Sequence, residues 1–200
     1  MPVEVTRITE KDIDGAIDCV QKAFADDPYN RWVFNDRDKD TSSSTPDKVL
    51  GVAMWLAPSN PFAPESWFSY MGSWQLWFQQ LYMNAVYGRG GLNVKRYYIW
   101  KAAQAAAQKE LWTDEKGYYF CNIVTVLPEE QGKGIGKELF GAVQDMADRE
   151  GKRCYLESSR AEPNMKIYEK MGFELKREML CDDNGDSIML YCMIREPKTG

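Results

Sequence analysis

Histidine is absent from the 200 residues of this chain, and its absence removes several kinds of chemistry. Nucleophilic catalysis by a Ser–His or Cys–His pair needs an imidazole base, so both arrangements are excluded. The five cysteines include no Cys-x-x-Cys pair, and without histidine they form no zinc pattern. We therefore expect no metal site, reduced cysteines in the core and a cytoplasmic protein, because reducing compartments keep thiols unpaired.

Long apolar runs are also lacking. Residues 1–14 carry early acidic side chains and no apolar core region, so we expect no signal peptide. Residues 51–87 are nearly free of charge, but Pro58, Pro61 and Pro64 interrupt them. No run of about 18 apolar residues exists, so we predict no transmembrane helix and no membrane partner.

Positive charge is the minority: 25 Lys and Arg stand against 30 Asp and Glu, a net charge of -5. A general nucleic-acid binder needs a basic patch, so we expect no nucleic-acid partner. The acidic balance mildly favours cationic partners such as amines. A chain of this length is expected to form one domain, residues 1–200, with a sizeable core.

In the first half, alternation of apolar and polar residues predicts a short strand over residues 3–8. Thr9 and Asp12 resemble a capping box that opens a helix. Four apolar residues give that helix one stripe, and Asp27-Pro28 ends it; the stripe is Ile13, Ile17, Val20 and Phe24. A polar loop over 35–47 precedes a β-branched, apolar strand over 49–56.

Residues 58–112 have a different texture and predict a helical insertion of two helices, hinged near residues 88–91. The second helix, over 95–111, is rich in strong helix formers. The first carries aromatic residues at helical spacing, among them Trp67, Trp74, Trp77 and Tyr82. Our preferred interpretation is a stripe buried in the core. The alternatives are a cover over an acceptor pocket, and a dimer or membrane-surface patch.

The second half reads as a regular series of strands and helices. Residues 118–127 form the most strand-like run, apolar on both faces and therefore expected to be central. A helix over 134–150 ends at Gly151, and a strand over 154–158 and a short helix over 163–171 follow. Strands over 173–180 and 187–194 flank a turn and predict a hairpin. The order predicts a mixed α/β domain.

The sharpest motif lies between the central strand and the next helix, where residues 131–136 read QGKGIG. Glycines let a ligand approach the backbone, and a helix start offers free N–H groups, so this loop is suited to phosphate. The sixth position of a Rossmann fingerprint would be Lys137 or Leu139, so that motif fails. The Walker pattern fails too, because Glu138 follows Lys137. What remains is Gln-x-x-Gly-x-Gly, at Gln131, Gly134 and Gly136.

A second constellation follows the strand over 154–158. Asn164 and Tyr168 are four residues apart and so share one helix face, with Gly172-Phe173 directly after them. A phenol at this place can donate a proton to a leaving group.

Together these motifs resemble the GNAT superfamily of N-acetyltransferases, whose pyrophosphate loop has the form Gln/Arg-x-x-Gly-x-Gly/Ala and whose later helix reads Asn-x-x-x-Tyr-x-x-x-Gly-Phe. The similarity is strongest over residues 118–195 and is nearest to puromycin-N-acetyltransferase-like members. It implies an α/β GNAT-like acyl-CoA N-acyltransferase fold and acetyl-CoA as cofactor. It implies cofactor contacts at Val124, Thr125, Val126, Gln131, Gly132, Lys133, Gly134, Ile135, Gly136, Lys137, Asn164 and Tyr168.

The resemblance further implies direct transfer of acetyl to a primary amine in one ternary complex, with Tyr168 as the acid. Candidate bases are Glu157, since burial raises a carboxyl pKa toward a useful range, or a water held by tyrosine and backbone groups. For Glu157 the equal alternative is a salt-bridged or substrate-orienting role. We expect a small-molecule amine acceptor, and we also consider a homodimer. Alternatives are a protein N-terminal or lysine acetyltransferase and a non-catalytic acyl-CoA-binding module. The family also pairs two strands before the insertion, and only residues 49–56 are evident here.

Overall fold

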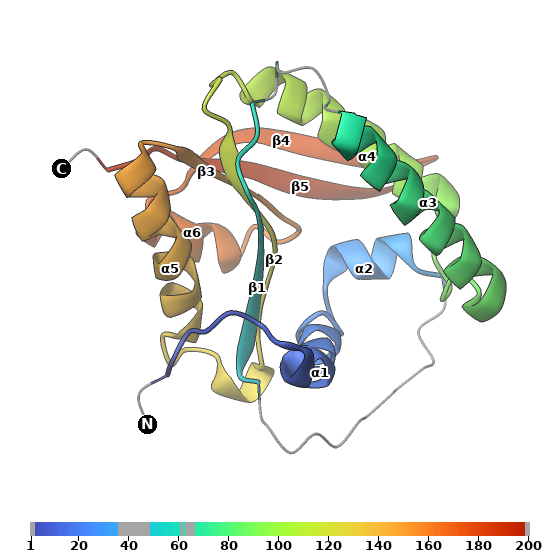
Figure 1. Cartoon of the computed structure of the whole chain (residues 1–200), viewed down its shortest axis with the longest axis horizontal. Helices are drawn as coiled ribbons and strands as arrows, with labels where there is room; N and C mark the ends of the chain where they lie inside the picture. Colours follow the sequence, from blue (N-terminus) through green and yellow to red (C-terminus); the bar gives the residue numbers. More distant parts are fainter. Residues whose placement is uncertain (1–2, 36–48, 61, 63–66, 199–200) are drawn as a thin grey trace.

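The computed structural model describes residues 3–35, 49–60, 62 and 67–198. Its five strands form one mixed sheet in the order β1-β2-β3-β5-β4 (Figure 1). They are β1 Gly51–Leu56, β2 Tyr118–Val126, β3 Arg153–Ser158, β4 Glu174–Asp183 and β5 Asp186–Arg195. β2 and β3 run parallel, and every other neighbouring pair is antiparallel. The predicted mixed α/β architecture and the 118–127 strand at an inner position are confirmed.

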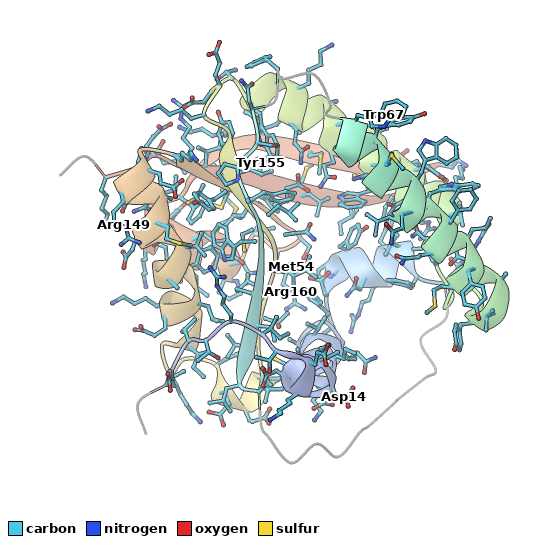
Figure 2. All side chains as sticks on the ribbon, in the orientation of Figure 1. Asp14, Met54, Trp67, Arg149, Tyr155 and Arg160 are labelled. Carbon is cyan, nitrogen blue, oxygen red and sulfur yellow. The ribbon has the colours of Figure 1, made fainter. Side chains whose placement is uncertain are left out.

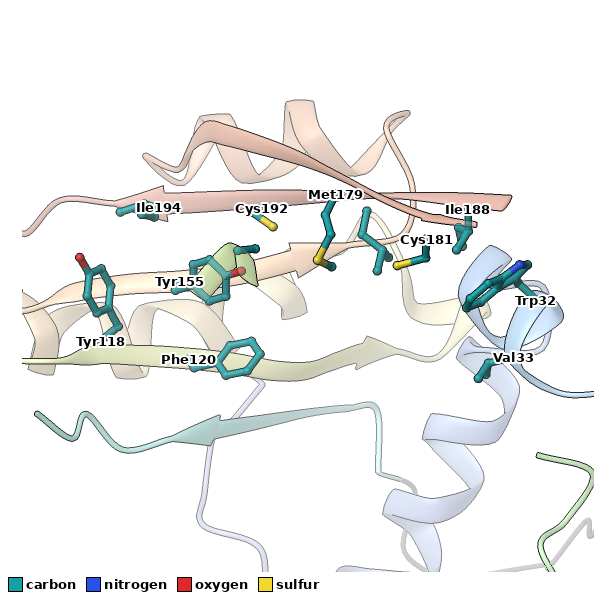
Figure 3. Close-up of a cluster of buried hydrophobic side chains, with 12 residues drawn as sticks. Trp32, Val33, Tyr118, Phe120, Tyr155, Met179, Cys181, Ile188, Cys192 and Ile194 are labelled. Atoms are coloured by element: carbon teal, nitrogen blue, oxygen red, sulfur yellow. The ribbon is translucent and has the colours of Figure 1, made fainter. Parts of the chain in front are cut away.

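The helices lie on both faces of this sheet. They are α1 Ile13–Ala23, α2 Pro28–Val33, α3 Trp67–Tyr87, α4 Val94–Leu111, α5 Ile135–Glu150 and α6 Asn164–Lys170, with short 3-10 turns η1 Glu10–Asp12 and η2 Pro128–Glu130. One buried cluster packs α2 and α4 against the sheet through Trp32, Ala107 and Tyr155 (Figure 3). The other packs α5 and the α6 region against the opposite face through Phe140 and Leu156.

Local chemistry accounts for most helix ends. Asp12 accepts hydrogen bonds from the backbone N–H and the hydroxyl of Thr9, at 2.8 and 2.6 Å. The predicted capping pair is therefore present. Gly151 ends α5 with φ 61°, a left-handed conformation that glycine adopts without steric cost. The predicted hairpin is also confirmed, since β4 and β5 are joined through Asn184 and Gly185.

Two predictions in the N-terminal region are corrected by the structure. Residues 3–9 form no strand: they are exposed, and among the described residues β1 pairs with β2 alone. Alternation alone cannot make a strand without a partner for its hydrogen bonds. The apolar stripe of the first helix holds only in part: Ile13 and Ile17 are exposed, and Val20 and Phe24 are partly buried. The buried residues of α1 are Gly15, Ala16 and Cys19. Because small residues let the helix approach β1 and β2 closely, the face of α1 with the small residues packs on the sheet.

The insertion forms two helices, as predicted, with left-handed Gly88, Gly90 and Gly91 at the hinge. The preferred interpretation of the aromatic stripe is wrong, however. The large apolar side chains described on α3, from Trp67 to Tyr87, are between 46% and 72% exposed. Figure 2 shows Trp67 standing on the outer side of α3. The aromatic rings of α3 contact one another rather than the core; the ring centroids of Trp74 and Trp77, for example, are 5.8 Å apart.

Some sequence expectations fall outside what the structure describes. The doubtful strand before Val49 concerns residues 35–47, and residues 36–48 lie outside the described residues. In the part of the chain that the structure describes, no helix is long and apolar enough to cross a membrane. All five cysteines are buried and free.

Candidate active site

The most distinctive feature of the sheet is the place where β2 and β3 separate. They pair from Tyr118 with Arg153 to Cys121 with Leu156, and the pairing stops there. Beyond this point β2 stays paired with β1 as far as Val126, and β3 stays paired with β5. We call this opening the fork, defined by residues 122–126 of β2 and 157–158 of β3. The backbone N–H and C=O groups that face this opening take no part in β2–β3 hydrogen bonding.

A register shift in β1 marks the beginning of the fork. Met54 pairs with Ile123 and Trp55 pairs with Cys121, so Asn122 has no partner on β1. Asn122 is also exposed, in the middle of an inner strand. Bulges of this kind re-aim side chains next to active sites. Sequence reasoning missed Asn122, although a polar residue inside an otherwise apolar strand was the available signal.

The predicted phosphate loop lies directly after the β2 side of the fork. Gly134 is the N-cap of α5 with φ 87°, and it carries no side chain that could cap the helix. A Cβ at Gly132 or Gly134 would meet nothing within 4 Å, so the loop faces open space. Gln131 folds back and donates from Nε2 to the Val126 carbonyl at 3.2 Å. The first N–H groups of α5 are thus presented as an anion-binding site.

The remaining loop residues have different surroundings. Ile135 is buried, Lys133 pairs with Glu130 at 2.8 Å, and Lys137 is exposed. Upstream, Val124 packs toward α5, whereas Thr125 is buried against Cys19 of α1. The structure therefore brings the predicted loop and strand residues together at one end of the fork, but their side chains point to different faces.

On the α5–α6 face of the fork lie Tyr168 and Asn164. The Tyr168 ring packs against Phe140 and Phe173, with centroids 5.6 and 6.2 Å apart. Burial raises the pKa of the Tyr168 phenol, and the Cys121 thiol and the Asp27 carboxylate raise it further. The phenol therefore keeps its proton at neutral pH. The Asn164 Nδ2 lies 3.5 Å from the Ser158 hydroxyl, which places it at the end of β3.

Glu157 lies on the other face of the sheet. Its neighbour Leu156 packs in the cluster with Phe140, and adjacent strand residues point to opposite faces. Its carboxylate accepts a hydrogen bond from the Tyr155 hydroxyl at 2.8 Å and another from Gln104 Nε2 of α4 at 2.9 Å. Burial raises the pKa of Glu157, and the hydrogen bonds from Gln104 and Tyr155 and the charge of Lys101 oppose that rise. Glu157 and Tyr168 thus approach the fork from opposite faces.

Asp27 is a further buried carboxylate that sequence reasoning treated only as a helix stop. It is 8% exposed and accepts from the backbone N–H of Asn30 at 3.1 Å, as the N-cap of α2. Its other oxygen accepts a hydrogen bond from the Ser159 hydroxyl, directly after β3. No local sequence pattern links residues 27 and 159, so only the fold could reveal this contact.

Known proteins resemble this chain in sequence and fold. A family model described as the acetyltransferase (GNAT) domain matches residues 95–175, which include the fork, the glycine loop and Tyr168. A Schizosaccharomyces pombe protein described as an uncharacterized N-acetyltransferase is 31% identical over 156 residues, 74% of this chain and 57% of that protein. Residues 95–175 form a GNAT acetyltransferase domain.

Other GNAT relatives extend over more of the chain. A second Schizosaccharomyces pombe N-acetyltransferase is 26% identical and covers 94% of this chain and 89% of its own length. The crystal structure of arylalkylamine N-acetyltransferase 2 from Aedes aegypti has a TM-score of 0.61 at 16% identity, covering 96% of this chain and 98% of that one. The predicted GNAT fold is confirmed, and the names of these relatives support the predicted acyltransferase class. The puromycin-N-acetyltransferase-like subgroup and the role of each site residue stay predictions.

Among the described residues, no group of three His, Cys, Asp or Glu side chains could hold a metal ion.

Proposed function

We propose that this GNAT protein transfers the acetyl group of acetyl-CoA to the primary amine of a small molecule, directly and within one ternary complex. The observation that carries the proposal is the fork, which opens between the uncapped start of α5 and the protonated Tyr168. A helix start suited to an anion, free backbone groups and a phenol around one gap in the sheet support this proposal.

The residues at this end of the sheet fit CoA. The uncapped helix start, with glycines at 132, 134 and 136 and open space before the first two, suits a pyrophosphate. Gln131 and Asn164 border this region and would orient the cofactor. Acetyl-CoA supplies the acetyl group in activated form, as a thioester.

The chain's own residues would then assist the transfer in two ways. Backbone N–H groups on the free side of residues 122–126 would stabilise negative charge on the thioester oxygen. Tyr168 would donate its proton to the departing thiolate, since a phenol is protonated at neutral pH. On the opposite face, Glu157 would receive the proton that an ammonium group must lose before it attacks.

A small-molecule acceptor has two supports. The net charge of -5 favours a cationic partner. The neighbour of TM-score 0.61 is named for arylalkylamine substrates. Protein acetylation and acyl-CoA binding without catalysis remain the alternative outcomes of the test below.

The test measures acetyl-CoA-dependent thiol release with a panel of small primary amines and of peptides with free N-termini or lysines. Turnover on a small amine, identified by mass spectrometry of the acetylated product, supports the proposal. Turnover on peptides alone, or CoA binding without turnover on any amine, contradicts it. Tyr168→Phe should reduce kcat by about 10²-fold or more. The control Tyr119→Phe, at the paired end of β2 opposite Cys154, should keep wild-type kcat.

A further inference from the structure

The face of the fork opposite Tyr168 holds a carboxylate that the proposed reaction has not yet used. Asp27 lies on the connection between α1 and α2, and its contact with Ser159 fixes it two residues beyond Glu157. Ser159 directly follows the last residue of β3, so Asp27 lies near the end of the strand that carries Glu157. α2, which Asp27 caps, packs in the same buried cluster as Tyr155. Asp27 and Glu157 therefore share one face of the sheet.

The two carboxylates differ in how they are held. Both oxygens of Glu157 accept hydrogen bonds, one from Gln104 of α4 and one from Tyr155 of β3. Asp27 is held by one backbone N–H and one hydroxyl, and it forms no ion pair with a described residue. A carboxylate oxygen can accept two hydrogen bonds, so Asp27 retains capacity for a donor. A buried carboxylate without a cation is costly unless a charged partner arrives.

Aromatic rings of α2 and α4 lie on the same face of the sheet as Asp27. Tyr29, two residues further on, packs against Trp100 of α4 with ring centroids 5.3 Å apart, and Trp100 contacts Tyr97 at 5.7 Å. These three rings are only partly buried. Burial raises the pKa of the Tyr29 phenol first, and Tyr97, Cys181, Glu157 and Asp27 raise it further. The Tyr29 hydroxyl is therefore within electrostatic range of both carboxylates.

Asp27 is also close to the other side of the fork, since Ser159, which donates to it, directly follows Ser158, whose hydroxyl lies 3.5 Å from Asn164 Nδ2. A cation held by Asp27 would thus lie between the face that carries the rings and the gap that leads to the candidate acid. This is where an amine must be placed to meet an acetyl group.

We propose that Asp27 binds the ammonium group of the acceptor, and that Tyr29, Tyr97 and Trp100 receive an aromatic body attached to it. The proposal rests on the proposed function and names its substrate class: a primary ammonium ion on an aromatic group. Asp27 supplies the charge that distinguishes this cation from a neutral molecule of the same shape, and the rings supply apolar and stacking contact with the aromatic body.

The test compares two probes of matched shape, 2-phenylethylamine and the uncharged 2-phenylethanol, by calorimetric titration of the CoA-loaded protein. Wild-type protein should bind the amine roughly tenfold or more tightly than the alcohol, and Asp27→Asn should remove most of that preference. Asparagine is also a good N-cap, so α2 should keep its start, and a thermal melt checks this. The matched control is Asp26→Asn, an exposed neighbour paired with Arg31, which should keep the wild-type preference.

Equal affinity of wild-type protein for both probes, no saturable binding of the amine, or an unchanged preference in folded Asp27→Asn overturns the proposal. The proposed function is judged separately, by CoA binding and by turnover on the amine panel. If acetyl transfer to a small amine occurs while Asp27→Asn keeps the charge preference, this inference fails and the proposed function stands. If no transfer occurs while the charge preference depends on Asp27, this inference stands and the proposed function fails.

Discussion

The ion pair between Arg195 and Asp148 fixes the last turn of α5, the helix whose first turn forms the anion site. Arg195 is 2% exposed and donates from both terminal nitrogens to the Asp148 carboxylate, each at 2.7 Å. Removing one partner of a buried pair costs about 3–5 kcal/mol. Because the Asp148 side chain is 20% exposed and asparagine keeps one acceptor oxygen, we expect Asp148→Asn to cost about 2–3 kcal/mol. For this size, that lowers Tm by roughly 5–10 °C.

Chemical denaturation and thermal melts measure this cost, and pH supplies an internal check. The hydrogen bonds from Arg195 hold the pKa of Asp148 below its ordinary value. The pair therefore stabilises the fold above about pH 4, and its contribution is lost as pH falls through the lowered pKa. The difference between variant and wild type should shrink in that acidic range. The control Glu150→Gln breaks an exposed pair with Lys152 on the same helix and should cost less than about 1 kcal/mol. A cost of Asp148→Asn no larger than the control's would refute the reasoning.

Three further predictions concern the core, a turn and the fork. Trp74→Ala should change the free energy of unfolding by less than about 0.5 kcal/mol because Trp74 is exposed, whereas Phe140→Ala should cost about 3–5 kcal/mol; equal costs would restore the core interpretation of α3. Gly117→Ala should lower stability by roughly 2–4 kcal/mol, measured by urea denaturation, since φ is +75° and a Cβ would overlap the Ser59 backbone. Because burial raises the pKa of Glu157, ionisation destabilises the fold as pH rises through that pKa; Glu157→Gln should therefore melt above wild type at pH 7, with the gap closing toward pH 4, and a lower melting temperature at pH 7 would contradict this.

The second half of the chain could be predicted because its signals are local. The loop at residues 131–136 sits between a strand and a helix, and Asn164 and Tyr168 share one short helix, so adjacent residues fix each element. The fork itself could not be predicted, because it depends on where two strands 35 positions apart stop pairing, Cys121 with Leu156 being the last pair.

The first half of the chain was harder to predict, because its structure depends on contacts between residues that are far apart in the sequence. Residues 3–8 alternate as a strand does, yet a strand exists only if another backbone completes its hydrogen bonds. Apolar spacing suggested that α3 was buried, yet periodicity reports a stripe and not what covers it. Asp27 and Ser159 meet across 132 residues, a contact set by tertiary packing alone.

Calorimetric titration of acetyl-CoA tests the central claim most directly. Wild-type protein should bind it with micromolar affinity. Gly136→Glu should lose that binding, because its carboxylate would occupy the anion site, while its Cβ would meet only Val126 at 3.9 Å and so leave the fold intact. Gly141→Glu, the same change later in α5 with nothing within 4 Å, should bind as wild type does. Absence of binding to folded wild-type protein, or equal binding by Gly136→Glu, would contradict the assignment of this loop to CoA.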